Sequence, residues 1–306
     1  MSLPIPAARS RRAAALICLI ALAVLAAACG GNTAANTPIA PSFVPAATVA
    51  PTPTAGAPTN TAIPATATEA PPSATAAPPS ATPGLLPSIA VLAYHHFGVP
   101  AAGDYDVPLN KFEMHLKWLK HNDYESVSPQ QLVDAIHDGY TLPAHPVMIT
   151  FDDDNSEQYT DAAPLLEKYG YRGAFFIDTV TIGKRYFMTA DQLKDLERRG
   201  HTLGTHTWDH RDLAILTMDE VKDQLNRSES DLEEVLGHKP LFMSYPFGAY
   251  NAEIVAELEA RGYHGAFRLR DHADPVVDPA FMIHRQIIPG VWSMKDFANN
   301  VHWMEP

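Results

Sequence analysis

Residues 147–159 read VMITFDDDNSEQY, an apolar segment that runs directly into three adjacent aspartates. The first five residues suit a buried strand. Neighbouring carboxylates repel one another, and folding raises that cost unless a cation or solvent absorbs the charge. Asp152, Asp153 and Asp154 therefore need a role that explains why they stand together.

Strand and helix patterns alternate on both sides of this stretch. Ser128 and Thr189 are expected helix caps, and Thr217 with Glu220 forms a capping box. Repeated strand and helix units predict a mainly parallel sheet, either closed as a barrel or open and doubly wound. In both architectures the site lies at the carboxyl ends of the strands. The expected strands are 88–96, 147–151, 173–177, 201–206, 241–245 and 265–267, and the expected helices are 110–122, 129–137, 157–169, 189–200, 217–237 and 251–261.

The aspartates stand where the 147–151 strand ends. In an ideal strand Asp152 and Asp153 point to opposite faces, so both reach one site only if the strand breaks there. The alternative is that Asp154, Asn155 or Ser156 caps the next helix while the other carboxylates face solvent. A calcium loop of the EF-hand kind fits poorly, because its glycine and closing glutamate are absent.

A second stretch, HTLGTHTWDHRDL at 201–213, places His206 and His210 four residues apart. One helical turn would put both imidazoles on one side, a spacing suited to chelating a metal, although such pairs are often structural. A zincin motif is excluded because Thr207 stands where the catalytic glutamate would be. With a carboxylate from another strand end, the two imidazoles would make a three-ligand site with a position open for water.

The first 87 residues differ from the rest. Residues 1–29 carry three arginines, an apolar run of about 16 residues and the sequence AAAC ending at Cys29, which together predict an export signal. Cys29 resembles a lipoprotein processing site, although Ala26 replaces the usual leucine; an ordinary cleaved signal or an uncleaved anchor are the alternatives. Residues 30–87 are rich in Pro, Thr and Ala and predict a disordered tether of up to about 180 Å.

Residues 88–306 are predicted to form one domain. Of the 22 basic and 35 acidic residues in the chain, the first 87 residues hold only three arginines and one glutamate, so this domain is strongly acidic. Such a surface repels nucleic acid and anionic lipid, and we expect membrane contact only through the N-terminal segment. Both cysteines lie before residue 30, so any metal site in the domain uses nitrogen and oxygen ligands.

Three segments together resemble the polysaccharide deacetylases, the NodB-homology or carbohydrate esterase family four domain. TFDDD at 150–154 resembles the family's TFDDG motif, HTWDH at 206–210 resembles its H-[ST]-x-x-H motif, and YPFGAYN at 245–251 resembles a form of its third motif. The resemblance covers nearly all of 88–289. It implies a distorted (β/α) barrel of the deacetylase type.

The resemblance also implies roles for individual residues. Asp152 matches the family's general base, and Asp153, His206 and His210 match its ligands for Zn²⁺ or another divalent ion such as Co²⁺ or Ni²⁺. The ion activates a water and polarises the acetyl carbonyl. The backbone N–H of Phe247 is expected to help hold the oxyanion.

The general acid is less clear from the motifs. The family usually takes it from a late histidine, for which His284 is the nearest match. The start VLAYHHF instead resembles the branch that deacetylates poly-β-1,6-N-acetylglucosamine, and this selects His95. Its neighbour His96 is expected to point elsewhere or to orient the chain.

Two departures from the family pattern concern charge beside the base. Asp154 replaces the motif glycine and is expected to add charge next to the site. The arginine that steadies the base in many members is absent from FMSYPFG, as it is in the poly-N-acetylglucosamine branch. Arg172 and Arg285 are available, and for both we expect solvated or structural roles.

Two aromatic residues adjoin the motifs, and we expect Trp208 and Phe247 to offer surfaces for stacking a sugar ring. His201, His264 and His272 have no motif context and are expected to be structural or exposed.

These residues predict a monomeric, metal-dependent hydrolase outside the cytoplasm. It would remove N-acetyl groups from a surface or cell-wall polysaccharide that contains N-acetylglucosamine. The alternatives are an O-acetyl esterase acting on xylan or another acetylated glycan, and a glycan-binding lipoprotein without activity. A general base beside a metal argues against the last of these.

Overall fold

The computed structural model describes residues 87–97, 103–269 and 278–303. The predicted signal segment, all but the last residue of the predicted tether, and His272 lie outside these ranges. Within them, none of the helices combines the length and apolar character needed to cross a bilayer.

A single sheet of parallel strands organises the domain. Its order is β8-β7-β6-β5-β4-β3-β1-β9, and the short strand β2 (Glu125–Ser126) pairs with β3 on the side. The register between the neighbouring strands β1 and β3 sets Tyr94 opposite Phe151, so these two strands end together. The six longer strands are β1 (Ala90–Tyr94), β3 (Pro146–Phe151), β4 (Gly173–Ile177), β5 (Thr202–Thr205), β6 (Phe242–Ser244) and β7 (Gly265–Arg268).

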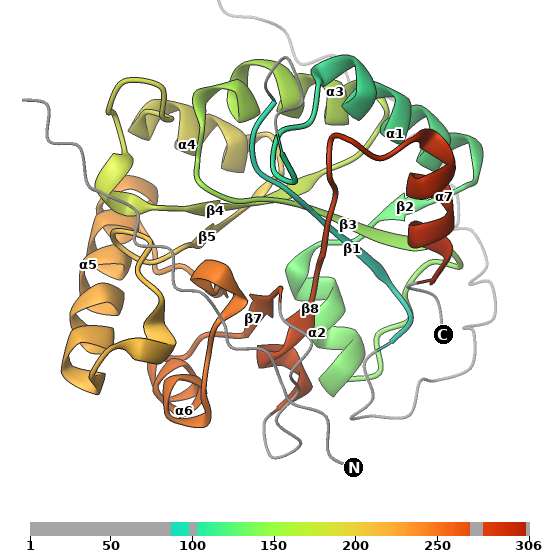
Figure 1. Cartoon of the computed structure of the whole chain (residues 1–306). Coiled ribbons are helices and arrows are strands. Elements are labelled where there is room, and N and C mark those ends of the chain that lie inside the picture. Colours follow the sequence, from blue (N-terminus) through green and yellow to red (C-terminus); the bar gives the residue numbers. More distant parts are fainter. Residues whose placement is uncertain (1–86, 98–102, 270–277, 304–306) are drawn as a thin grey trace, which may run out of the picture. The chain divides into compact units, whose positions relative to one another are not determined.

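One short segment near the C-terminus joins the two edges of this sheet. Strand β8 (Ile283–His284) pairs with β7, and β9 (Gln286–Ile287) pairs with β1, with only Arg285 between them. The segment therefore bridges the first and last long strands and nearly closes the sheet into a barrel (Figure 1). This confirms the predicted (β/α) barrel rather than the open, doubly wound alternative.

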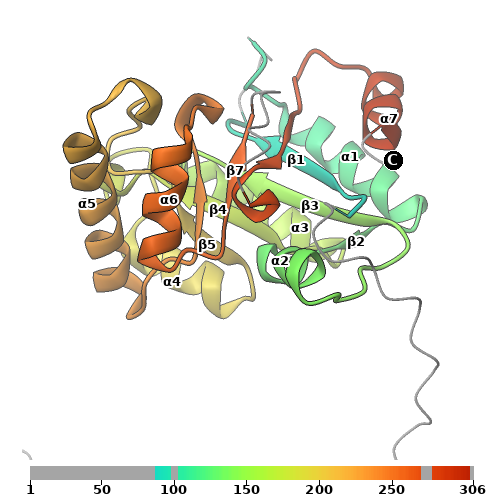
Figure 2. The same ribbon diagram turned by 90° about the horizontal axis from the view of Figure 1, so that it is seen from below.

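Helices lie around the outside of the strands, with α5 packed against α6 and α1 against α7 (Figure 1, Figure 2). The predicted caps are confirmed, because Ser128, Thr189 and Thr217 each make a complete capping box. The helices are α1 (Leu109–His121), α2 (Pro129–His137), α3 (Ala163–Lys168), α4 (Ala190–Arg198), α5 (Met218–Leu236), α6 (Ala252–Arg261) and α7 (Met294–Trp303).

The helix after the aspartates differs from the single α-helix expected over 157–169. It is interrupted by a π-helical segment, Gln158–Ala162, which directly precedes α3. Pro164 lies in the first turn of α3 and has no N–H for an α-helical bond to the preceding turn. The wider turn also leaves the side chain of Gln158 completely buried.

Alternate side chains of β1 and β3 pack into two different hydrophobic clusters. Leu92 and Ile149 belong to the cluster that includes α1 and α3, whereas Val91 and Met148 belong to the cluster that includes α2, α5 and α6. The residues of β3 thus face alternate sides, as a strand requires. Asp152 continues the face of Met148, so the end of β3 brings a carboxylate into the protein interior.

Candidate active site

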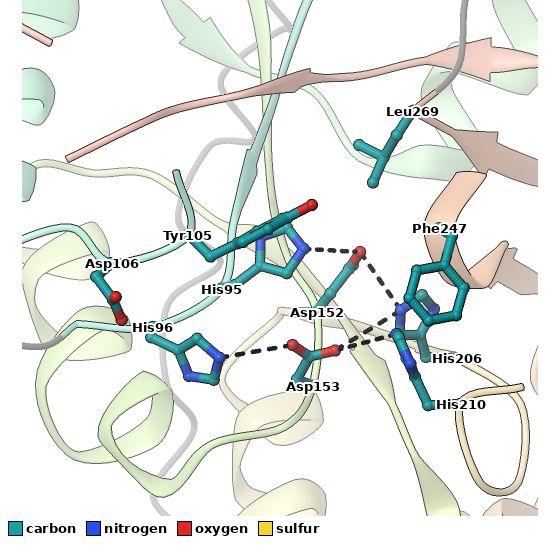
Figure 3. A pocket seen from close by; sticks show the side chains of 10 residues that line it. All are labelled: His95, His96, Tyr105, Asp106, Asp152, Asp153, His206, His210, Phe247 and Leu269. Atoms are coloured by element: carbon teal, nitrogen blue, oxygen red, sulfur yellow. Dashed lines mark ion pairs between the residues drawn. The ribbon is translucent and has the colours of Figure 1, made fainter. Parts of the chain in front are cut away.

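The chain breaks at the end of β3 and brings two aspartates to one rim, which is the condition under which the sequence allowed both to reach one site. Asp152 still follows the strand, since its N–H donates to the Tyr94 carbonyl at 3.1 Å, and its side chain is completely buried. The chain then turns sharply, with φ of 70° at Asp153 and 37° at Asp154. Neither Asp152 nor Asp153 is left in solvent, and both line the same pocket (Figure 3).

Asp153, His206 and His210 form a cluster whose ligand atoms all lie within 4.8 Å of one another. Asp153 Oδ1 lies 3.8 Å from His206 Nε2 and 3.7 Å from His210 Nε2 (Figure 3). This oxygen is shielded from solvent and has no hydrogen-bond partner among the described residues. A carboxylate oxygen and two imidazole nitrogens converging in this way fit a divalent transition metal ion.

A hydrogen bond to the Ser244 backbone holds His206 in the tautomer that a metal ligand needs. Its Nδ1 lies 2.7 Å from the Ser244 carbonyl and, as that carbonyl can only accept, Nδ1 carries the proton. The lone pair of Nε2 is therefore directed toward Asp153. Burial lowers the pKa of His206, which also favours the neutral ligand form.

A loop rather than a helix brings the two histidines together. His206 follows β5 directly, and the chain then passes through positive φ at Thr207 (73°) and at His210 (58°). Thr207 Oγ1 accepts the His210 N–H at 3.1 Å, and Gln224 Oε1 accepts the backbone N–H groups of Trp208 and Asp209. The predicted pairing is present, but the helical turn expected for it is wrong.

Arg285 holds Asp152 with two parallel hydrogen bonds, and both residues are almost fully buried. Nη1 donates to Oδ1 and Nη2 donates to Oδ2, each at 2.7 Å. Ser244 adds a third bond to Oδ2 at 3.2 Å. Burial would raise the pKa of Asp152, but the charges of Arg285 and His206 hold it well below its usual range. The solvated or merely structural role expected for Arg285 is therefore wrong: it steadies the carboxylate, as the missing motif arginine would.

His95 comes from the end of β1 and faces the same carboxylate. Its Nε2 lies 3.8 Å from Asp152 Oδ2, and its ring packs edge-on against Tyr105 at 4.6 Å (Figure 3). Burial lowers the pKa of His95 to about 4, and the Asp152 charge opposes this shift. The other candidate acid, His284, lies in β8 and does not line the pocket.

His96 also lines the pocket, contrary to the expectation that it points elsewhere. Its Nε2 lies 3.8 Å from Asp153 Oδ2, the oxygen turned away from the two other histidines. The chain leaves the β1 ladder at this point and pairs with another segment through a bridge to Asp106. Strand alternation therefore no longer separates His95 from His96.

Asp154 does not add charge to the pocket, which corrects the expectation for this position. It is completely buried, accepts hydrogen bonds from the Thr181 hydroxyl and the Asp178 N–H, and does not line the site. Burial raises its pKa to about 7. Asp154 fastens the turn that carries Asp153 to the loop after β4, and no side chain of residues 154–156 caps the following helix.

The pocket has a volume of about 420 Å³. Phe247 is 51% exposed, has a φ of 57°, and packs edge-on against His210 at 4.7 Å. Trp208 is not part of it: its ring lies under Arg227 at 4.2 Å and lines a different pocket. The pocket is lined by His95, His96, Tyr105, Asp106, Asp152, Asp153, His206, His210, Phe247 and Leu269.

Three of the lining residues, Tyr105, Asp106 and Leu269, were not anticipated from the sequence. None lies in a motif, and only the folded loops bring them to the rim. The remaining histidines behave as expected where they are described: His201 is buried against Gly173 and Glu167, and His264 is exposed.

Residues 139–266 match the family model described as polysaccharide deacetylase. The chain carries a polysaccharide deacetylase domain. It is therefore a deacetylase, a hydrolase. Among its relatives, the YxkH protein of Bacillus subtilis, named for the same family, is 29% identical over 210 residues, which are 68% of this chain and 74% of that protein.

Two other relatives extend this picture. A poly-β-1,6-N-acetyl-D-glucosamine N-deacetylase of Staphylococcus aureus is 28% identical over 185 residues, covering 56% of this chain and 63% of that protein. The solved structure of the Streptococcus pyogenes deacetylase PplD in complex with acetate superposes with a TM-score of 0.63 at 25% identity, covering 74% of this chain and 100% of that one.

The family match covers only part of this deacetylase site. It includes the aspartates of β3 and the histidines after β5, but His95 lies before the matched segment and Arg285 lies after it. The positions of these two residues beside Asp152 therefore rest on the geometry of this chain.

Proposed function

We propose that this deacetylase removes N-acetyl groups from a polysaccharide that contains N-acetylglucosamine, with a divalent ion held by Asp153, His206 and His210. The observation that carries the proposal is a buried carboxylate, Asp152, held by Arg285 at the edge of the three-ligand cluster. A module that only bound glycan would need neither the carboxylate nor its arginine.

The three ligands suit Zn²⁺, with Co²⁺ or Ni²⁺ as alternatives, because they offer two imidazoles and one carboxylate. An ion bound there would lower the pKa of a coordinated water and polarise the acetyl carbonyl.

Asp152 is the proposed general base. Its lowered pKa keeps it ionised at neutral pH, and its Oδ2 lies 3.7 Å from His206 Nε2, beside the position that the ligands define. It takes one proton from the attacking water while a C–O bond forms at the acetyl carbon. Because Arg285 and Ser244 fix both oxygens, the base needs little reorganisation before it accepts the proton.

His95 is the proposed proton donor to the leaving nitrogen. Its Nε2 lies 3.8 Å from Asp152 Oδ2, so a proton taken by the carboxylate has a short path through the imidazole to the amine. The C–N bond then breaks, and the products are acetate and the free amino sugar. The imidazole carries the additional proton only during this transfer, which agrees with its low pKa in the resting protein.

The pocket and the relatives support the proposed substrate class. A volume of about 420 Å³ admits an acetamido group with part of its sugar ring, and Phe247 offers an exposed aromatic face at the rim. The acidic domain tolerates a glycan that is neutral and becomes cationic as acetyl groups are lost. The likeness to a poly-β-1,6-N-acetyl-D-glucosamine N-deacetylase favours a β-1,6-linked polymer.

The test is acetate release from β-1,6- and β-1,4-linked N-acetylglucosamine oligomers and from acetylated xylan. We expect release from the β-1,6 oligomers that EDTA abolishes and zinc restores, and none from Asp152→Asn. Release from xylan alone would identify an O-acetyl esterase, and glycan binding without any release would contradict the proposed activity.

For the N-terminal part we propose export and lipid anchoring at Cys29, supported by the signal-like pattern of residues 1–29. The domain then acts outside the cytoplasm as a monomer. Labelled palmitate incorporated by the full chain and lost in Cys29→Ser is the expected result, and light scattering checks the oligomeric state. Equal labelling of both proteins would contradict the lipid anchor.

A further inference from the structure

Gln158 is a fully buried polar side chain that touches the backbone beneath both proton-transfer residues. Its Nε2 donates to the His95 carbonyl at 2.8 Å and to the Asp152 carbonyl at 2.5 Å. It is not among the residues that line the pocket. Its contacts therefore lie behind the site, on the two strands that carry the base and the proton donor.

The chemistry of these contacts fixes the orientation of the amide. Two carbonyl oxygens can only accept, so the amide nitrogen must face them and the amide oxygen must point away. Gln158 Oε1 is buried and has no hydrogen-bond partner among the described residues. A flipped amide would set one oxygen against two others, so neither glutamate nor a flipped glutamine can make the same bridge.

The two hydrogen bonds from Gln158 Nε2, which together bridge the His95 and Asp152 carbonyls, lie where the hydrogen bonds between β1 and β3 end. The register of β1 and β3 ends at Tyr94 and Phe151, and the last bond between the strands runs from the Asp152 N–H to the Tyr94 carbonyl. The next carbonyls, of His95 and Asp152, belong to buried residues and would cost free energy if left unpaired. The π-helical turn places Gln158 where it supplies a hydrogen to each.

The two residues depend on this bridge to different degrees. The Asp152 carboxylate is held independently by Arg285 and Ser244. The His95 ring has an edge contact with Tyr105, and its Nδ1 is buried without a hydrogen-bond partner among the described residues. The position of His95 therefore relies on its backbone.

We propose that Gln158 is a positioning residue that sets His95 at the distance from Asp152 required for protonating the leaving amine. This role rests on the proposed deacetylase function. The role predicts different effects on two kinds of substrate. The amine of an amide must gain a proton to leave, whereas p-nitrophenolate leaves as a stable anion. Loss of the bridge should therefore slow amide cleavage much more than cleavage of an activated ester.

The experiment compares wild type with Gln158→Leu and Gln158→Glu on N-acetylglucosamine oligomers and on p-nitrophenyl acetate, with circular dichroism to verify folding. For both variants we expect kcat on the oligomers to fall by roughly 100-fold, the lower end of the range for a general acid, with KM little changed. The ester rate should fall less than about threefold. Gln158→Glu keeps the side-chain size, so it tests the role if Gln158→Leu folds poorly.

Val255→Ala, a core truncation in α6, is the matched control for lost stability. This variant should lower the rates on the oligomers and on p-nitrophenyl acetate by the same factor. Equal losses on both substrates in the Gln158 variants, or no loss on the oligomers, would overturn the positioning role. Absence of chelator-sensitive acetate release from wild type would refute the proposed function and this role with it.

Discussion

Arg285 and Asp152 stand 133 positions apart in the sequence, and their buried side chains form a two-armed ion pair with both N–O distances at 2.7 Å. Arg285 is also the residue between β8 and β9, the two short strands that join the edges of the barrel. The same segment thus nearly closes the barrel and orients the proposed base.

Arg285→Lys should lower kcat for acetate release by at least roughly tenfold with little change in KM, because an ammonium group cannot reproduce the two-armed contact. Arg285→Met should lower the free energy of unfolding by about 3–5 kcal/mol, since it leaves a buried carboxylate unpaired. Steady-state kinetics and urea unfolding measure the two effects. Arg172→Lys, at an exposed arginine, is the control, and full turnover by Arg285→Lys would contradict the orienting role.

The three adjacent aspartates should respond differently to the same substitution. Asp152→Asn should retain zinc but lose turnover, Asp153→Asn should lose zinc, and Asp154→Asn should retain both, because its side chain faces Thr181 rather than the pocket. Zinc affinity is measured by competition with a chromogenic chelator, and turnover by acetate release. Wild-type zinc affinity in Asp153→Asn would refute the ligand set.

Truncating the two aromatic residues beside the motifs, Phe247 and Trp208, should have different effects on KM. Phe247→Ala should raise KM for oligomers by roughly three- to tenfold, as expected for losing one aromatic contact of about 0.5–1.5 kcal/mol. Trp208→Ala should leave KM unchanged, because its ring lies under Arg227 and outside the pocket. Kinetics over a series of oligomer lengths measures both. A larger KM effect from Trp208→Ala would place the substrate elsewhere.

We expect the buried side chain of His115 to make the stability of the protein depend on pH, independently of catalysis. It is fully buried, its ring stacks on Phe297 at 4.0 Å, and burial with the nearby Lys111 charge lowers its pKa to about 3. Below pH 6.5 the unfolded chain binds a proton that the folded chain does not. Stability should therefore fall by up to about 1.4 kcal/mol per pH unit between pH 6.5 and 3.

The check is urea unfolding of wild type and His115→Phe between pH 7.5 and about 5. The variant loses the hydrogen-bond partner of the Tyr94 hydroxyl at every pH, so it should be less stable throughout but with a shallower decline. Parallel declines in the two proteins would show that His115 does not titrate as predicted.

Local patterns in the sequence were enough to predict the strand and helix alternation and the capped helices, but they left a barrel and an open sheet as alternatives, and only the resemblance to the deacetylases implied the barrel. Asp152, Asp153 and His206 follow strands whose carboxyl ends share one rim, and the resemblance to the family motifs selected them together with His210. The chemistry of two imidazoles and a carboxylate is a property of residue types, and it needs only their proximity.

Tertiary structure decided what happens after each strand ends. Positive φ values at Asp153 and Asp154 send adjacent carboxylates to different places, and the end of the β1 ladder lets His96 face the pocket beside His95. Side-chain period describes residues within a strand and carries no information past its last bond.

Tertiary structure also decided that Arg285 pairs with the proposed base, Asp152. Strands β8 and β9 are two residues each, too short for any periodic signal, so neither the near closure of the barrel nor the inward direction of Arg285 could be read from the sequence. The sequence determined which chemical groups this protein has and the approximate rim where they gather. Only packing between distant segments decided which groups touch, because each contact depends on backbone turns and burial that local residue patterns do not encode.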